Sequence, residues 1–79
     1  LNGEYEIIEA EIIETSELVN KELKNSNLPD EIRIGAVLRG DEVIIPRLNF
    51  VFKKQDIVVL LAQKDFLHVV ENMFRLSSV

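Results

Sequence analysis

The sequence predicts an α+β domain, a two-layer sandwich in which helices cover one side of a mixed or antiparallel four-stranded sheet. Three observations predict this class. Runs rich in β-branched residues alternate between apolar and polar positions, turn residues separate the runs, and two segments carry an amphipathic helical pattern. The 79 residues fit one domain. The expected order is strand, short helix, three strands, helix.

The first strand is expected within residues 4–14, where isoleucine and alanine alternate with glutamate. The residues expected on its buried face are Ile8, Ala10 and Ile12. Thr15 and Ser16 offer a hydroxyl cap for the next segment, because a hydroxyl accepts from the free N–H groups of a first helical turn. Residues 17–24 are therefore expected to form a short helix of about two turns.

The second and third strands form a predicted hairpin. Residues 32–39 read as a strand, and the residues expected on its buried face are Ile32, Ile34, Ala36 and Leu38. Gly40 and Asp41 form a two-residue turn in which glycine takes positive φ. Residues 42–45 complete the hairpin, and Pro46 ends it because proline has no N–H for a strand ladder.

The last two elements are a buried strand and a helix. Residues 57–62 are apolar on both faces, which favours the central position in the sheet. Residues 64–74 carry the amphipathic pattern of a helix. Its apolar stripe consists of Phe66, Leu67, Val70, Met73 and Phe74.

The composition argues against several functional classes. The chain has no cysteine and one histidine, His68, which is expected on the polar surface of the last helix. Nucleophilic catalysis needs a nucleophile beside an oriented base, so we expect no enzyme and no catalytic residue. The glycine spacing fits no phosphate-binding loop. The net charge of −5 disfavours nucleic acid and anionic membrane surfaces, and no apolar run could insert into a bilayer.

Two features of the sequence are candidate sites. The glutamates of the first strand, at 4, 6, 9, 11 and 14, read as a solvated edge that resists aggregation, with divalent-ion binding across a dimer as the alternative. We expect no metal site within one chain. Ile44, Ile45 and Pro46 form an apolar lip at the end of the hairpin. Such a lip can hold a flat ligand or a partner strand, or it simply ends the strand.

The order of these motifs resembles the C-terminal domain of TrkA-type potassium-uptake regulators, the RCK C-terminal domain. The resemblance runs through Ser16–Val19, Leu28–Pro29, Ile34–Gly40, Ile44–Pro46 and Gln55–Leu60. Asn20 and Gln55 stand where the family usually has glycine, and Asn tolerates left-handed backbone better than Gln does. By this resemblance residues 4–76 form the regulatory domain, residues 1–3 are a linker remnant and residues 77–79 are a tail.

The resemblance also implies a function. The domain would be a cytoplasmic, dimerising and ligand-sensing unit that gates a membrane potassium channel or transporter, with NAD or ATP bound only by a preceding Rossmann domain. Cyclic di-AMP or a divalent cation would be the effector, and the implied ligand-binding residues are Arg39, Ile44, Ile45 and Pro46. The alternatives are a purely structural dimerisation domain and a regulator of another ion transporter. An amino-acid-binding domain of the ferredoxin-like class is less favoured, because the two halves of the chain are dissimilar.

Overall fold

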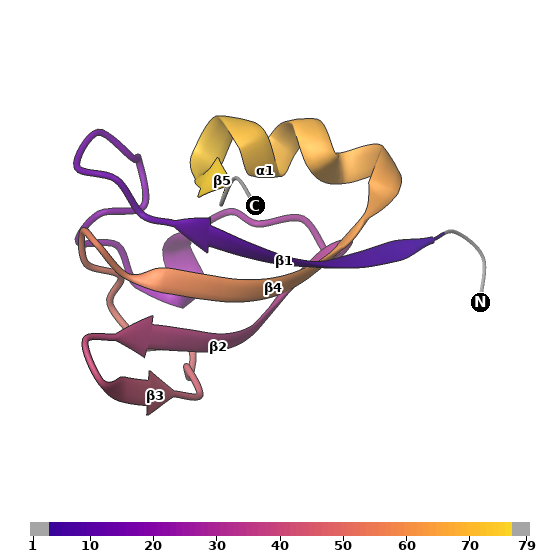
Figure 1. The fold of residues 1–79 in the computed structure, drawn as a ribbon. Helices are drawn as coiled ribbons and strands as arrows, with labels where there is room; N and C mark the ends of the chain where they lie inside the picture. The colour runs from indigo at the N-terminus through magenta and orange to yellow at the C-terminus, as the bar shows by residue number, and fades with distance from the viewer. Residues whose placement is uncertain (1–3, 77–79) are drawn as a thin grey trace.

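The computed structural model describes residues 4–76, which form an antiparallel sheet covered on one side by helical segments and loops (Figure 1). The predicted linker remnant and tail lie outside these residues. The strands follow the order β3-β2-β4-β1-β5. Their bounds are β1 Tyr5–Glu11, β2 Ile32–Arg39, β3 Glu42–Ile44, β4 Ile57–Gln63 and β5 Arg75–Leu76. The α+β class is confirmed, and the two-residue strand β5 beside Ala10 and Glu11 is an addition that the sequence did not predict.

Strand β4 occupies the middle of the sheet, as its apolar sequence predicted. It pairs with β1 along its whole length and with β2 on its other side. Val58, Leu60 and Ala62 are buried on the covered face, where Val70 of the helix joins the same core. The alternation predicted for β1 is also confirmed, because Ile8 and Ala10 face this core while Ile7 is 79% exposed.

Strand β2 differs from its prediction in its second half. The pairing with β4 shifts between Ile34 and Ala36, which marks a bulge at Gly35. Because an extra residue reverses the alternation, Val37 is buried, whereas Ala36 and Leu38 fall on the opposite face. The prediction that Ala36 and Leu38 share the face of Ile34 is therefore wrong.

The β2–β3 hairpin forms as predicted. Arg39 pairs with Glu42 across a two-residue turn, and Gly40 adopts φ 61°. Strand β3 ends at Ile44, two residues before Pro46.

The predicted short helix over residues 17–24 is replaced by turns at residues 17–20, a bridge from Glu22 to Val51 and the 3₁₀ helix η1 (Leu23–Asn25). Asn20 has φ 66°, which an α-helix cannot contain. The N–H groups of Asn20 and Leu23 bind the carbonyls of Phe52 and Phe50, at 2.8 Å each, and not carbonyls one turn earlier. Tertiary hydrogen bonds thus replace the helical ones.

The C-terminal helix is confirmed. It begins as the 3₁₀ turn η2 (Lys64–Phe66) and continues as α1 (Leu67–Met73). Val70 and Met73 are buried, whereas His68 is exposed as predicted. The Ser16 hydroxyl donates to the Met73 carbonyl at 2.8 Å and accepts from the Leu18 N–H, so it ties the loop after β1 to the helix end. Within residues 4–76 we find no helix with the length and apolar character needed to cross a membrane.

Candidate functional site

Three of the four predicted ligand residues form an apolar lip, and the fourth, Arg39, belongs to a partly buried ion pair. In the lip, Ile44 faces the core from its pairing position opposite Val37, while Ile45 is 71% exposed and Pro46 is half-buried. The lip therefore presents one large apolar side chain, Ile45, to solvent. Whether it binds a ligand stays a prediction.

Arg39 is held by Asp56, a residue whose role the sequence analysis missed. Arg39 Nε and Nη2 donate to the two carboxylate oxygens of Asp56 at 2.8 Å each, and Nη2 also donates to the Val51 carbonyl at 2.9 Å. The Asp56 carboxylate, 1% exposed, further accepts from the Lys53 N–H at 2.8 Å. The hydrogen bonds that Arg39 donates to Asp56 raise the pKa of Arg39, the charges of Asp56 and Glu42 act in the same direction, and burial opposes them. Arg39 is thus an anchor between the hairpin and the segment before β4.

This anchor leaves Arg39 with limited capacity for a ligand. A guanidinium has five N–H donors, and three of them are used by Asp56 and Val51. Only the Nη1 donors remain for a phosphate. Arg47, which follows Pro46 directly and is exposed, is a second cation beside the lip that the sequence analysis did not single out.

Aromatic packing and backbone pairing hold the segment after the lip. The Phe50 ring stacks edge-on against Phe52, with centroids 5.3 Å apart, and the Arg39 guanidinium lies 4.9 Å from the Phe50 ring centre. The Phe52 N–H donates to the Lys21 carbonyl at 3.0 Å, and Phe52 is fully buried. The segment that follows the lip is therefore held in place by ring packing and backbone hydrogen bonds.

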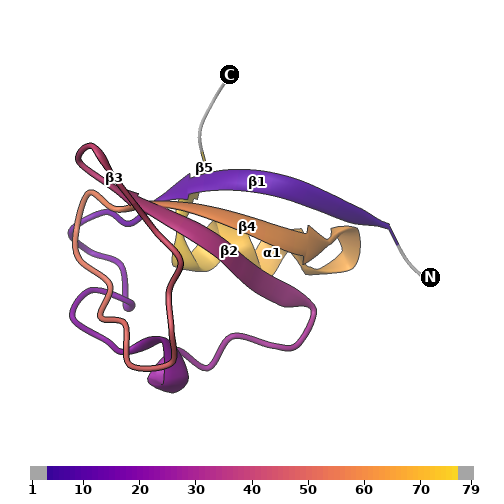
Figure 2. The same cartoon turned by 90° about the horizontal axis from the view of Figure 1, so that it is seen from below.

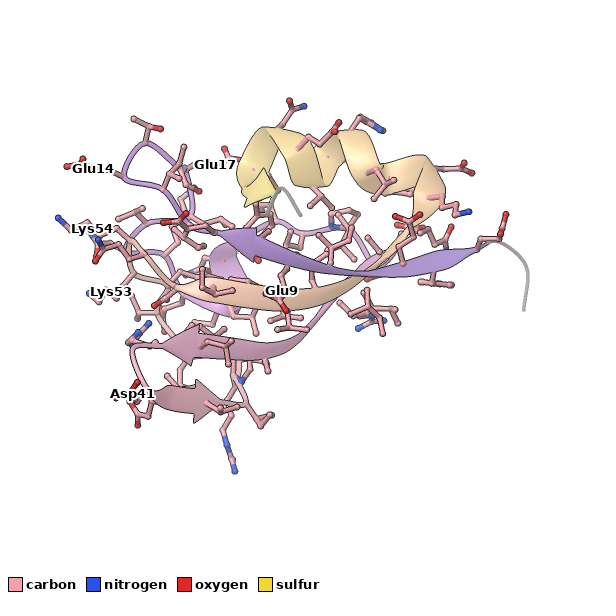
Figure 3. The ribbon with its side chains drawn as sticks, in the orientation of Figure 1. Glu9, Glu14, Glu17, Asp41, Lys53 and Lys54 are labelled. Atoms are coloured by element: carbon pink, nitrogen blue, oxygen red, sulfur yellow. The ribbon has the colours of Figure 1, made fainter. Side chains whose placement is uncertain are left out.

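The turn before β4 holds Gln55, which stands where the family usually has glycine. Gln55 adopts φ 73°, so this turn has left-handed geometry at a residue that is not glycine. The signal that could have revealed Asp56 is its place directly after this turn, at the start of an otherwise apolar strand. Lys53 and Lys54 of the same turn lie at the end of the sheet that also carries Asp41, whereas the lip follows the other end of β3 (Figures 1 and 3). The one adjacent pair of cations in the sequence is therefore not part of the lip.

A cleft of about 340 Å³ lies beside the lip but does not include it. Leu48, from the loop after Pro46, forms one wall, and the edge of β2 near Ile34 forms another. Lys24 and Arg33 add positive charge to its lining. None of the four predicted ligand residues lines this cleft.

In the part of the chain from residue 4 to 76, no three acidic or histidine side chains lie close enough together to hold a metal ion. The strand alternation places Glu9 and Glu11 on the uncovered face and Glu6 on the covered one. The divalent-ion alternative thus still depends on a second chain.

Comparison with known proteins places these features in a family. Residues 7–75 match the family model described as the TrkA-C domain. The chain is 46% identical over 98% of its length to the Trk system potassium uptake protein TrkA of Azorhizobium caulinodans. It is 35% identical over 92% of its length to TrkA of Haemophilus influenzae, and 34% identical over 81% to a TrkA homolog of Archaeoglobus fulgidus. The matched region covers only 17%, 16% and 15% of these relatives, in that order.

Proposed function

This chain belongs to the TrkA-C domain family, and we propose that it is the cytoplasmic, ligand-sensing and dimerising domain of a potassium transport protein. The family is regulatory and non-enzymatic. The potassium partner rests on the relatives, whose printed names describe potassium uptake proteins. The parent protein would bind a membrane channel or transporter subunit, and a nucleotide such as NAD or ATP would bind only to a separate Rossmann domain.

The observation that carries the sensing proposal is the exposed apolar lip at the end of a hairpin that the structure holds in place. Ile45 is 71% exposed, yet the β2–β3 hairpin before it is fixed to the segment before β4 by the bonds between Arg39 and Asp56. A flat base of a nucleotide such as cyclic di-AMP packs well on such a surface, because burying apolar area contributes about 25 cal/mol per Å². Arg47, which directly follows the lip, would supply the positive charge that phosphates need, whereas Arg39 pairs with Glu42 at the turn end of the hairpin and offers only its Nη1 donors.

Regulation would follow from differential affinity. A ligand that binds one dimer arrangement better than another shifts the population toward it, and the shift cannot exceed that difference in affinity. Coupling of this kind is typically about 1–3 kcal/mol, which corresponds to roughly 5–150-fold.

Isothermal titration calorimetry of the chain with cyclic di-AMP and, separately, with calcium tests the sensing proposal. Ile45→Glu should weaken cyclic di-AMP binding at least about tenfold, since it places a carboxylate where a base would stack. Leu48→Glu is the matched control, because Leu48 is similarly exposed at 69% and lies outside the lip. No heat with either compound would refute ligand sensing by these two effectors.

A structural dimerisation domain without a ligand is the second candidate, and the uncovered face of the sheet favours it. The two candidates differ in what the lip does. If Ile45→Glu in the full-length parent leaves both ion transport regulation and dimerisation unchanged, the lip has no role and the structural candidate stands. Measuring transport of potassium and of other cations by the same parent would identify the ion and test the alternative of another transporter.

A further inference from the structure

The outer edge of strand β2 is paired along only part of its length. Strand β3 pairs with residues 37–39 of β2. Within the described part of the chain, 4–76, residues 32–34 of β2 have β4 on one side and no strand on the other. After β3 the chain leaves β2 and runs toward η1 (Figure 2). Pro46 lacks the N–H that would continue the ladder, so the chain does not cover this edge itself. We name residues 32–34 the open edge.

The backbone of Ile34 points outward from the open edge. The Gln63 N–H donates to the Glu31 carbonyl at 3.1 Å, so Glu31 and Gln63 form a hydrogen-bonded pair between β2 and β4. Such pairs recur at every second residue of an antiparallel ladder, so Arg33 also directs its N–H and C=O groups toward β4. Ile34, the next residue, directs its own N–H and C=O groups to the other side. It therefore offers one donor and one acceptor to an added strand.

The cleft of about 340 Å³ opens along this same edge. Its lining includes Ile34, which packs against the core, and Arg33, which is exposed and lies on the uncovered face. Since neighbouring residues of a strand point to opposite faces, a cleft that both residues line lies at the edge of the strand. Leu23 and Leu48 add an apolar wall. An added strand would thus place alternate side chains beside this wall and beside Arg33.

The charges of the cleft favour an acidic occupant. Lys24 and Arg33 line it and are exposed, and Asp30 is the one acidic residue that lines it within residues 4–76. The whole chain has a net charge of −5, so this cationic excess is local. A residue directly opposite Arg33 on an added strand shares its face of the sheet, and a carboxylate there forms a favourable cross-strand pair.

We infer that the open edge binds an extended segment of a partner protein as an added antiparallel strand, with an acidic side chain opposite Arg33 and apolar side chains beside Ile34 and Leu48. The main-chain hydrogen bonds to Ile34 supply affinity, and the alternating apolar and acidic side chains supply specificity. This inference goes beyond the proposed function, because it uses neither the lip nor dimerisation.

The open edge is short, and its length limits the affinity. The Ile32 N–H already donates to the Pro29 carbonyl at 3.0 Å, so the pairing ends near this residue. Three strand residues span about 10 Å. Such a contact buries far less than the roughly 1,600 Å² of a standard interface. We therefore expect a transient complex with Kd on the order of 100 µM.

The probe is a short blocked peptide that alternates valine and glutamate, titrated into the isotope-labelled chain and followed by NMR. Without peptide, the Ile34 amide should exchange its hydrogen faster than the Arg33 amide, which is paired with β4. At a free peptide concentration of about ten times Kd, exchange at Ile34 should slow about tenfold, and amide signals of the open edge should shift. A peptide that alternates valine and lysine should bind about fivefold more weakly.

Matched variants test the side-chain contacts. Arg33→Glu should reverse the preference between the two peptides, whereas Lys54→Glu, the same charge change at an exposed turn outside the cleft, should not. Leu48→Glu should weaken the valine–glutamate peptide at least about tenfold, and Ile45→Glu should leave its binding unchanged. This pattern is the reverse of the one expected for cyclic di-AMP, so failure of this inference is distinguishable from failure of the sensing proposal. Circular dichroism confirms that each variant is folded.

Methylation of the peptide nitrogens tests the backbone pairing. Methyl groups on the valine nitrogens should abolish binding, because those N–H groups face β2, whereas methyl groups on the glutamate nitrogens should not. Equal binding of the two methylated peptides refutes the added strand. Equal shifts with N-acetylglutamate alone show that the cleft takes a small anion and overturn the peptide partner. An Ile34 amide that is as protected as Arg33 in the free chain, or a spectrum unchanged at about 1 mM peptide, refutes the open edge as a binding site.

Discussion

Removing the Arg39 side chain tests the ion pair that supports the lip. In Arg39→Met the Asp56 carboxylate loses its two guanidinium bonds and keeps only the Lys53 N–H. Breaking a buried ion pair by removing one partner costs about 3–5 kcal/mol. Because the Arg39 side chain is itself 36% exposed, water replaces part of the loss, and we expect about 2–3 kcal/mol.

Urea unfolding followed by far-UV circular dichroism measures this loss. A domain of this length is stable by roughly 4–12 kcal/mol, so the change is a large share of the total. With a slope of about 1 kcal/mol per molar, the midpoint should fall by about 2–3 M. The bond to Asp56 raises the pKa of Arg39, so the contribution is fully present below the ordinary arginine value and is lost only as pH rises through the folded one. The loss should therefore be the same at about pH 6 and pH 9, because Arg39 stays charged at both.

A matched exposed pair is the control for this prediction. Lys64 lies 3.4 Å from Glu4 with both side chains largely exposed, so Lys64→Met should cost less than about 0.5 kcal/mol. In Arg39→Met/Asp56→Asn no carboxylate is left unpaired, so the double variant should be more stable than Arg39→Met alone. An Arg39→Met chain as stable as Lys64→Met would refute the view that this pair anchors the hairpin.

Three further substitutions have expected outcomes in the same unfolding assay. Gln55→Gly should stabilise the domain by about 0.5–1 kcal/mol, because φ 73° strains glutamine but not glycine; no gain would contradict the strain at this turn. Gly40→Val should cost at least about 1 kcal/mol through backbone strain alone, since no atom lies within 4 Å of an added Cβ; Gly40→Asn should be far milder, and equal losses would argue for a steric cause. Ser16→Ala should cost about 1–2 kcal/mol, because the Met73 carbonyl and the Leu18 N–H both lose a partner; Ser16→Thr should retain most of the stability, and an unchanged midpoint for Ser16→Ala would show that water replaces the hydroxyl.

Most strands and the C-terminal helix could be predicted from short stretches of sequence, because neighbouring residues largely determine them. The alternation of Ile8 and Ala10 with glutamate, the turn at Gly40 and the stripe through Val70 and Met73 each follow from the period of a strand or a helix, or from backbone conformation. The apolar run of 57–62 likewise predicted the central strand, although only Val58, Leu60 and Ala62 on the covered face are buried and Leu61 on the other face is 39% exposed.

The errors occur where distant segments compete with local preference. Residues 17–24 carry a helical pattern, yet Asn20 and Leu23 bind the backbone at Phe52 and Phe50 instead. The bond between Arg39 and Asp56, seventeen positions away, was likewise not predicted, and the role of Arg39 toward a phosphate stays a prediction. Both interactions join residues far apart in the sequence and follow no repeating pattern, so the sequence alone could not predict them.

The sequence by itself determined the α+β class, the order of the main elements and the family resemblance, because these depend on periodicity and on turn residues. Only the tertiary structure decided which apolar residues form the core and which lie on the uncovered face of the sheet. The bulge at Gly35 reverses the alternation of β2 and moves Ala36 and Leu38 from the predicted core to that face. The sequence pattern of one strand does not reveal such an extra residue, because a bulge is defined by how the strand pairs with its neighbour.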